Sequence, residues 1–178
     1  MKVHFGRYPK DHTKERILRV KVDGFDVWGA DHTLAMIIHP VLVKLKEQKH
    51  GSPHVADEDV PEHLRSGNPP LEKTDVGLKI HSVEMEEDRE DLVHKRWDWA
   101  LDEMIWAFGE HIKDDTTEEF GSGEHDFKFV KLEDGSGSRM VQGPNHTWKF
   151  DYEGAKLKEK RMTNGRRLFA LHFSDLWE

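Results

Sequence analysis

The sequence predicts an α+β fold: a single compact domain in which a small antiparallel sheet packs against about three main helices, with a long irregular loop. Helical periodicity of apolar residues recurs in three segments, at about 34–48, 91–112 and 152–177. Short alternating segments bounded by turn residues lie at 17–22 and between 127 and 150. A length of 178 residues is typical of one domain, and no linker divides the chain.

The segment 91–112 is the predicted centre of the core. One face of this helix is apolar at helical spacing and comprises Val93, Trp97, Ala100, Leu101, Met104 and Phe108. A neighbouring polar stripe consists of His94, Asp98 and Asp102, spaced i, i+4 and i+8. Such a stripe is either solvated surface or the wall of a site.

Two further helices are expected to pack on this one. The first follows an N-cap at Asp31 or Thr33, and we expect Pro40 to kink or split it after Ile38, at a cost of about 3 kcal/mol unless packing compensates. Its apolar face comprises Leu34, Ile37, Ile38, Val41, Leu42 and Leu45. The C-terminal helix 152–177 is weakened by Gly165. Its apolar side comprises Leu157, Leu168, Phe169, His172, Phe173 and Leu176.

Strands are predicted at 17–22, from Phe127 to Leu132, at 139–142 and at 147–150, with a turn at 134–137. We expect residues 1–15 to form an extended arm and residues 114–124 a polar connection. Residues 50–79 are predicted to form a long loop containing one short helix, from Asp59 to about Arg65. The charged segment 84–91 is expected to lead into the central helix.

The charge balance and the residue composition exclude several classes of function. Acidic residues (35) outnumber basic ones (27), which disfavours broad duplex nucleic-acid binding. The chain has no cysteine, so disulfides, thiolate chemistry and cysteine zinc sites are excluded, and His, Asp and Glu remain as strong metal ligands. No apolar segment is long enough to span a bilayer, and we expect a soluble, cytoplasmic protein without membrane contact.

Three strings resemble a conserved, uncharacterised family of small proteins encoded by tailed bacteriophages, including T4-like and marine phages. They are DHTLAMIIHPVLVKLKEQKHGSPHVADEDVPEHLR, RWDWALDEMIWAF and NGRRLFALHFSDLWE. The resemblance covers most of the chain from Val27 onward and implies a phage origin with expression in the host bacterial cytoplasm. It implies no activity, so no catalytic residue is assigned from it.

Two groups of residues are candidate metal ligands. If the first two long helices pack antiparallel, Asp31 and His32 meet His94, Asp98 and Asp102, a set that suits zinc, manganese or iron. In the loop, His50 and His54 lie among further polar side chains, which are Ser52, Asp57, Glu58, Asp59 and His63. No HExxH or EF-hand motif supports either group, and the simpler explanation is solvated charges, with Asp31 as an N-cap.

A third candidate is a pocket for a small anionic ligand or a nucleotide. Trp99 and Trp106 lie off the core face at i and i+7, where a base could stack on them. The arginines that could reach phosphates are Arg96, Arg161, Arg166 and Arg167. The alternative is that both tryptophans pack against the C-terminal helix. No Walker loop or GxGxxG is present.

Together these patterns favour a phage accessory protein that binds a small anionic ligand or a host protein during infection. Counter-defence is one role of this kind. A metal-dependent hydrolase using the His/Asp cluster is one alternative. A virion-associated structural component is the other, although no fibrous repeat favours it. The sequence specifies neither the ligand nor the oligomeric state.

Overall fold

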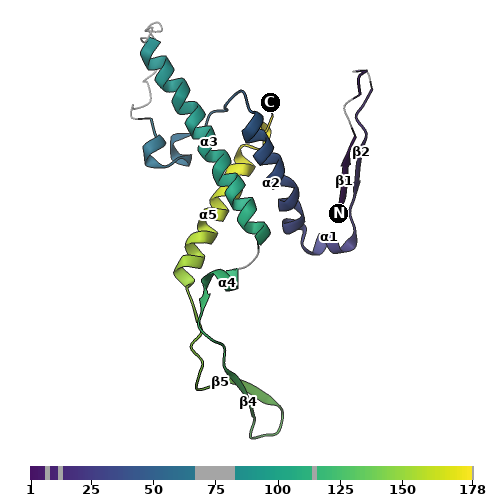
Figure 1. Ribbon diagram of the computed structural model, residues 1–178, viewed down its shortest axis with the longest axis vertical. Coiled ribbons are helices and arrows are strands. Elements are labelled where there is room, and N and C mark those ends of the chain that lie inside the picture. The colour runs from purple at the N-terminus through teal and green to yellow at the C-terminus, as the bar shows by residue number, and fades with distance from the viewer. Residues whose placement is uncertain (7–8, 12–13, 67–82, 114–115, 178) are drawn as a thin grey trace.

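The three main helices form the body of the molecule, and small antiparallel sheets lie around it, so the α+β class is confirmed (Figure 1). The helices are α2 (Ala30–Gln48), α3 (Val83–Lys113) and α5 (Tyr152–Leu171). None of the helices described has both the length and the apolar composition needed to cross a membrane. The computed structural model describes residues 1–6, 9–11, 14–66, 83–113 and 116–177.

Helix α3 packs against both α2 and α5, so its apolar face forms the centre of the core. Most of the predicted core face is confirmed, because Trp97, Ala100, Leu101 and Met104 are fully buried and Phe108 is buried. Val93, also predicted for the core, is half-buried. Helix α3 starts at Val83, earlier than predicted. Residues 84–91, predicted to lead into the helix, are part of it.

Helix α2 continues through Pro40 without a break, so the predicted split is wrong. Pro40 is exposed. Ala35, which precedes it in the helix, and Leu42, which follows it, are fully buried against the core, and their packing holds the helix together. The predicted apolar face is only half covered. Leu34 and Val41 are exposed, because α3 covers one side of α2 and the described chain leaves the other side open.

Helix α5 lies close against α3 at Gly165. A Cβ atom there would lie 2.4 Å from the Ala107 Cβ and 2.5 Å from the Glu103 carbonyl oxygen. The residue expected to weaken the helix therefore allows it to pack. The helix ends at Leu171, before the predicted end, and a 3-10 turn, η3 (Phe173–Asp175), follows it.

The C-terminal apolar side predicted for residues 152–177 is only partly correct. Leu168 is fully buried and His172 is buried, but Leu157 and Phe173 are exposed. Leu157 lies outside the contact with α3, and Phe173 follows the end of the helix, where the chain leaves the helical periodicity.

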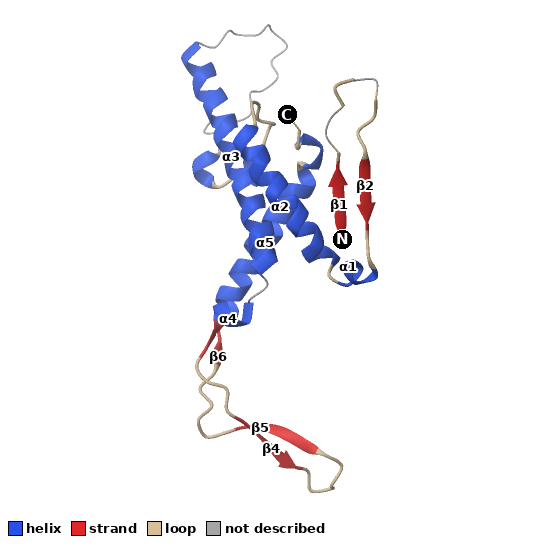
Figure 2. Cartoon of the chain, turned by 45° about the vertical axis from the view of Figure 1, so that its right-hand side comes forward, coloured by secondary structure: helices blue, strands red, loops and turns tan. Residues whose placement is uncertain are grey.

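The strands form three separate two-stranded antiparallel sheets, and not the single sheet that we expected. The pairs are β1 (Lys2–Phe5) with β2 (Leu18–Lys21), β3 (Gly121–Ser122) with β6 (Lys149–Phe150), and β4 (Phe127–Lys131) with β5 (Ser138–Gln142). The β1–β2 pair and the β4–β5 pair each extend away from the helices (Figures 1 and 2). The strands of each hairpin therefore pair only with each other, and the two hairpins do not join into one sheet.

The remaining elements are short. Helix α1 (Gly24–Trp28) joins β2 to α2, and α4 (Thr116–Phe120) lies in the predicted polar connection. Two 3-10 turns, η1 (Asp57–Asp59) and η2 (Glu62–Leu64), replace the predicted short helix. The segment bearing them buries its apolar side chains Val55, Val60 and Leu64 in the core. The rest of the predicted loop, 67–79, lies outside the described residues.

The α3–α5 approach gives a first prediction. Gly165→Ala should lower the free energy of unfolding by roughly 1 to 3 kcal/mol, because the added methyl group meets backbone and a buried side chain that cannot move away freely. Urea unfolding followed by far-ultraviolet circular dichroism measures the change. Gly24→Ala is the matched control, since its Cβ meets nothing within 4 Å. Equal stability of the two variants would contradict the close approach.

Candidate functional site

Helices α2 and α3 are antiparallel, the arrangement that the metal hypothesis required. At one end the Asp31 carboxylate lies 3.2 Å from His111 Nε2. At the other end Ser52 Oγ lies 2.8 Å from His94 Nδ1. The N–H of His32 and the charge of His111 hold the pKa of Asp31 below its usual range. Asp31 and His94 are thus at opposite ends of the contact, each with a partner of its own.

The other two residues of the polar stripe on α3 form ion pairs with lysines of α2 and its C-cap. Lys49 Nζ lies 3.1 Å from Asp98, and Lys46 Nζ lies 2.5 Å from Asp102. The stripe therefore faces α2, as the spacing predicted, but the cations opposite it are ammonium groups. These pairs are partly exposed and contribute little individually, but they help to fix how α2 and α3 align.

The remaining predicted metal ligands are dispersed. His32 is half-buried on α2, and His50 and His54 are exposed in the segment after it. Within the part of the chain that the structure describes, no group of three or more His, Asp or Glu side chains is placed to hold one metal ion. Neither predicted metal cluster is assembled there.

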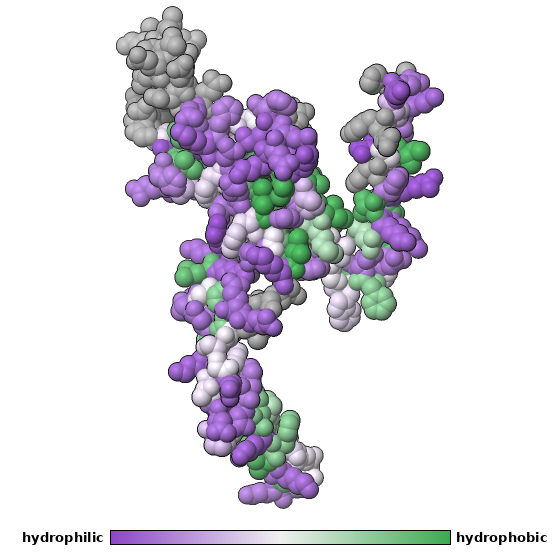
Figure 3. Space-filling view, in the orientation of Figure 1, coloured by the Kyte–Doolittle hydropathy of each residue, from purple (hydrophilic) through white to green (hydrophobic). Residues whose placement is uncertain are grey.

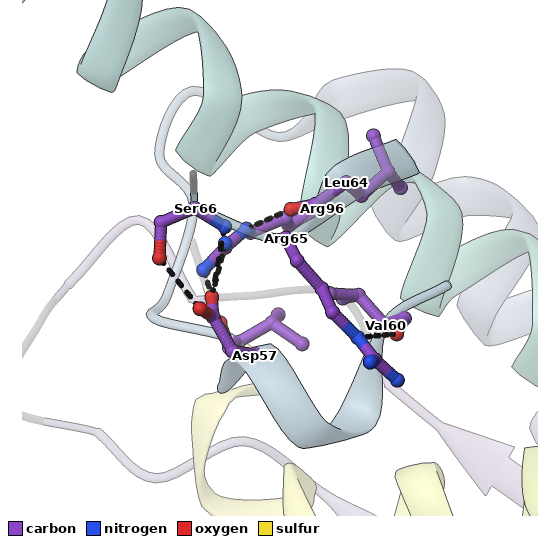
Figure 4. A network of polar contacts seen from close by, with 7 residues as sticks. Asp57, Val60, Leu64, Arg65, Ser66 and Arg96 are labelled. Carbon is purple, nitrogen blue, oxygen red and sulfur yellow. Dashed lines mark hydrogen bonds and ion pairs between the residues drawn. The ribbon is translucent and has the colours of Figure 1, made fainter. Parts of the chain in front are cut away.

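Arg96 lies inside the protein and holds the 55–66 segment against α3 (Figure 4). Its Nε donates to the Leu64 carbonyl at 2.7 Å, one terminal nitrogen donates to the Val55 carbonyl at 3.1 Å, and the other contacts the Asp57 carboxylate. Asp57 also accepts hydrogen bonds from the Ser66 hydroxyl and N–H, which together with Arg96 hold the pKa of Asp57 below its usual range. Arg96 is therefore occupied by the protein itself.

The three other predicted phosphate-binding arginines, Arg161, Arg166 and Arg167, also have carboxylate partners. Arg166 lies 2.5 Å from Glu159, which is about two turns before it on α5, and Arg167 lies 2.6 Å from Asp59 of η1. The pair between Arg167 and Asp59 connects α5 to the 55–66 segment. An anionic ligand would have to compete with these carboxylates for each guanidinium group.

The predicted tryptophan stripe is divided between two environments. Trp99 packs against the hydrophobic core. The guanidinium of Arg161 lies 3.9 Å from the ring centroid of Trp106, and it also binds Glu103 through hydrogen bonds of 2.8 and 3.0 Å. The face of Trp106 that a base would stack on is thus already in a cation–π contact.

A shallow hollow with a volume of about 410 Å³ lies beside Trp106, between α2 and the C-terminal part of α3. Its lining residues are His39, Ile105, Trp106, Gly109, Glu110, Ile112 and Lys113. Hydrogen bonds from Lys113 and Lys158 hold the pKa of Glu110 below its usual range, so its carboxylate is charged at neutral pH. Both lysines are paired with this carboxylate, so an anion in the hollow would compete with Glu110 for them.

The N-terminal arm, which we define as β1, β2 and α1, has two chemically different faces. The strand register places Val3 opposite Val20 on one face, with Leu18 beside it. On the other face Lys2 lies opposite Lys21, and His4 lies opposite Arg19. All four residues of β2 are exposed, so both faces are open to solvent.

The largest exposed side chains of the N-terminal arm are at its junction with α2. Phe25 and Trp28, both on α1, are 94% and 95% exposed. Soluble proteins seldom expose large apolar side chains together unless they form an interaction surface.

The second hairpin, β4–β5, forms another arm, which we call the C-terminal arm. Phe129 lies opposite Met140 in the strand register, and both are exposed, Phe129 by 74%. At the base of this arm the His125 ring stacks on the rings of Phe127 and Trp148, and the His146 ring packs at a tilt against Phe127. The rings stiffen the base of the arm, while its apolar strand pair stays open.

Neither arm was predicted from the sequence to expose an apolar surface. One signal was available, since Val3 and Phe5 alternate with polar residues as Leu18 and Val20 do. Pairing these two segments predicts a hairpin with one apolar and one basic face. That the helical body leaves the apolar face uncovered is a tertiary property, which no local pattern encodes.

The position of Arg96 gives a second prediction. Arg96→Met should lower the free energy of unfolding by roughly 3 kcal/mol, because two buried carbonyl groups lose a charged donor. Hydrogen exchange should show faster exchange of amides from 55 to 66. Arg65→Met is the matched control, since Arg65 is exposed and makes one long hydrogen bond of 3.4 Å to Val60. Similar exchange in both variants would contradict the role of Arg96.

The lowered pKa of Asp57 gives a third prediction. Because its folded pKa lies below the ordinary value of 3.8, the carboxylate stabilises the segment above that pH, and this stability is lost as the pH falls through the folded pKa. Hydrogen exchange between 55 and 66 should therefore accelerate in acid beyond the rest of the core. In Asp57→Asn this extra acid dependence should vanish; its persistence would assign it to another group.

The chain matches no protein-family model, no curated protein and no solved structure. Its function therefore has to be inferred from the contacts and surfaces of the chain itself.

Proposed function

We propose that this protein acts by binding other proteins through its N-terminal and C-terminal arms. The observation that carries the proposal is the exposure of large apolar side chains on both arms, with Phe25, Trp28 and Phe129 each at least 74% exposed. Buried aromatic anchors contribute much of the binding energy in protein interfaces. Three such residues open to solvent on projecting elements are suited to that role.

The stability of the hairpins supports the same proposal. A two-stranded hairpin alone is marginally stable in water, and its unpaired edges invite further pairing. Both arms are two-stranded, and neither buries a strand face against the helices. A partner that packs on the arms would supply the missing burial and would order them at the same time.

The contacts of the other candidate residues argue for protein binding over the alternatives. For a nucleotide or another small anion, the arginines Arg96, Arg161 and Arg167 are paired with carboxylates, and the chain carries a net charge of −8. For a metal-dependent hydrolase, Asp98 and Asp102 are neutralised by lysines. The apolar side chains of the arms, by contrast, remain open to solvent.

The resemblance to phage proteins suggests where such binding would occur. In an infected bacterium the partner would be a host protein in the cytoplasm or another phage protein. A component of host defence is one such host protein. The projecting arms favour a second form of the same proposal, a virion-associated component, since arms that reach away from a helical body suit contacts between subunits.

Site-specific photo-crosslinking tests the proposal. A photoreactive phenylalanine analogue at position 28 or 129 should give discrete crosslinked protein products in cells that express the chain. The control carries it at Lys160, an exposed polar position on α5. Trp28→Ser and Phe129→Ser should reduce the products formed by crosslinkers placed nearby on the same arm. Equal labelling at the arms and at position 160 would overturn the proposal.

A further inference from the structure

We infer that the N-terminal arm binds duplex DNA through one face of its β1–β2 hairpin. This inference goes beyond the proposed protein-binding function, because it uses the strand face opposite the apolar one. It follows from the placement of the cations on the two strands, from how few carboxylates neutralise them, and from the shape of a two-stranded ribbon.

The cations of the two strands all lie on one face of the hairpin. Residues directly opposite each other in an antiparallel pair share a face, and so do alternate residues along a strand. The register therefore gathers four exposed side chains, which we call the basic face: Lys2, His4, Arg19 and Lys21. Because neighbouring strands lie about 4.8 Å apart and alternate residues about 7 Å apart, these four side chains start from one small patch.

The basic face is unfavourable for the hairpin itself. Lys2 lies directly opposite Lys21, and like charges in that position destabilise a strand pair. Lys21 lies 3.7 Å from the Asp23 carboxylate, but both side chains are largely exposed, so this ion pair contributes little. Among the described residues, no carboxylate pairs with Lys2 or Arg19. The fold does not explain this clustering of cations, which therefore points to binding of an anion.

The net charge of −8 does not decide the electric field at the basic face. The first 22 residues contain seven Lys and Arg but only two Asp and Glu. The arm extends away from the helical body in Figure 1, and Figure 3 shows that hydrophilic as well as hydrophobic side chains reach its surface. Exposed charges more than about 8 Å apart are largely screened at physiological salt, so the nearby cations dominate. A narrow face can bind phosphates even though the whole chain disfavours a broad nucleic-acid surface.

The composition of the basic face favours a phosphate polymer over a protein or a membrane. Protein interfaces have apolar and aromatic anchors at their centre and are depleted in lysine, whereas none of the four positions of this face is apolar. An anionic membrane is disfavoured for a different reason. The side chains that would enter the bilayer interface are Val3, Leu18 and Val20, and they lie on the opposite face of the hairpin.

The shape of the hairpin favours duplex DNA among the nucleic acids. The major groove of B-DNA is about 12 Å wide and admits a two-stranded β-ribbon, whereas the major groove of duplex RNA is too deep and narrow for side chains to read. Single-strand binding relies on several aromatic rings on which bases stack, and the basic face offers only the ring of His4. With this face toward the groove, Arg19 can donate to base edges while Lys2 and Lys21 contact phosphates. The apolar face then points away from the DNA and stays free for a protein.

Fluorescence anisotropy of a short labelled DNA duplex tests the inference on the full chain. The wild-type chain should bind with a micromolar Kd at low salt. The logarithm of the affinity should fall with the logarithm of the salt concentration with a slope of about −3, because three permanent cations each release counterions from one phosphate.

The decisive variant is Lys21→Glu, which places a carboxylate directly opposite Lys2. It should weaken DNA binding at least tenfold, and the new cross-strand ion pair should at the same time slow amide exchange in β1 and β2. The matched control Lys160→Glu makes the same charge change at an exposed position of α5 and should bind DNA within twofold of the wild type. If circular dichroism shows that Lys21→Glu does not fold, Arg19→Gln/Lys21→Gln replaces it, with the same expected loss of binding.

Four results would overturn the inference. They are no binding of the duplex by the wild-type chain at low salt, unchanged binding by Lys21→Glu, equal losses in Lys21→Glu and Lys160→Glu, and binding of single-stranded DNA, duplex RNA or anionic phospholipid vesicles as tight as that of duplex DNA. The test is separate from that of the proposed function. Trp28→Ser should reduce the protein crosslinks of the arm but bind DNA like the wild type, and Lys21→Glu should do the reverse.

Discussion

The fold depends on the packing of α3 between α2 and α5. Trp97, Leu101 and Met104 are buried in this contact, and the lack of a side chain at Gly165 lets α5 approach the α3 backbone closely. A core of this kind is sensitive to a single added methyl group, because interior atoms are close-packed. The 55–66 segment and both arms are attached to this three-helix unit, so their positions follow from it.

Polar side chains along these contacts join the elements to one another. Arg96 holds the 55–66 segment, Arg167 connects the same segment to α5 through Asp59, and lysines of the α2 region neutralise the acidic stripe of α3. A buried or half-buried charge needs a partner, and here the partner is another part of the chain. Residue types that suggested a site in the sequence therefore stabilise the fold.

Among the described residues, large exposed apolar side chains lie on the arms and on α2. Burial of such surface is the main favourable term in protein association, whereas exposed ion pairs contribute little. The proposed function therefore rests on the exposed hydrophobic surface of the molecule and not on its clusters of titratable side chains. Phe25, Trp28 and Phe129 are the exposed residues that support this proposed function most directly.

The sequence by itself determined the fold class, the existence and type of the long helices, and the core face of α3. Helical periodicity is a local property, so it can be recognised from a single segment of the sequence. It also placed His94, Asp98 and Asp102 on the face that meets an antiparallel α2. Only the tertiary structure decided which charges pair with which, since Lys46 and Asp102 are far apart in the chain. It likewise decided that Pro40 stays inside α2, that the strands form separate hairpins, and that Leu34 and Val41 remain uncovered. The sequence does not distinguish an apolar residue that is buried within its own chain from one that stays exposed and could contact another protein, because the hydrophobic effect is not directional.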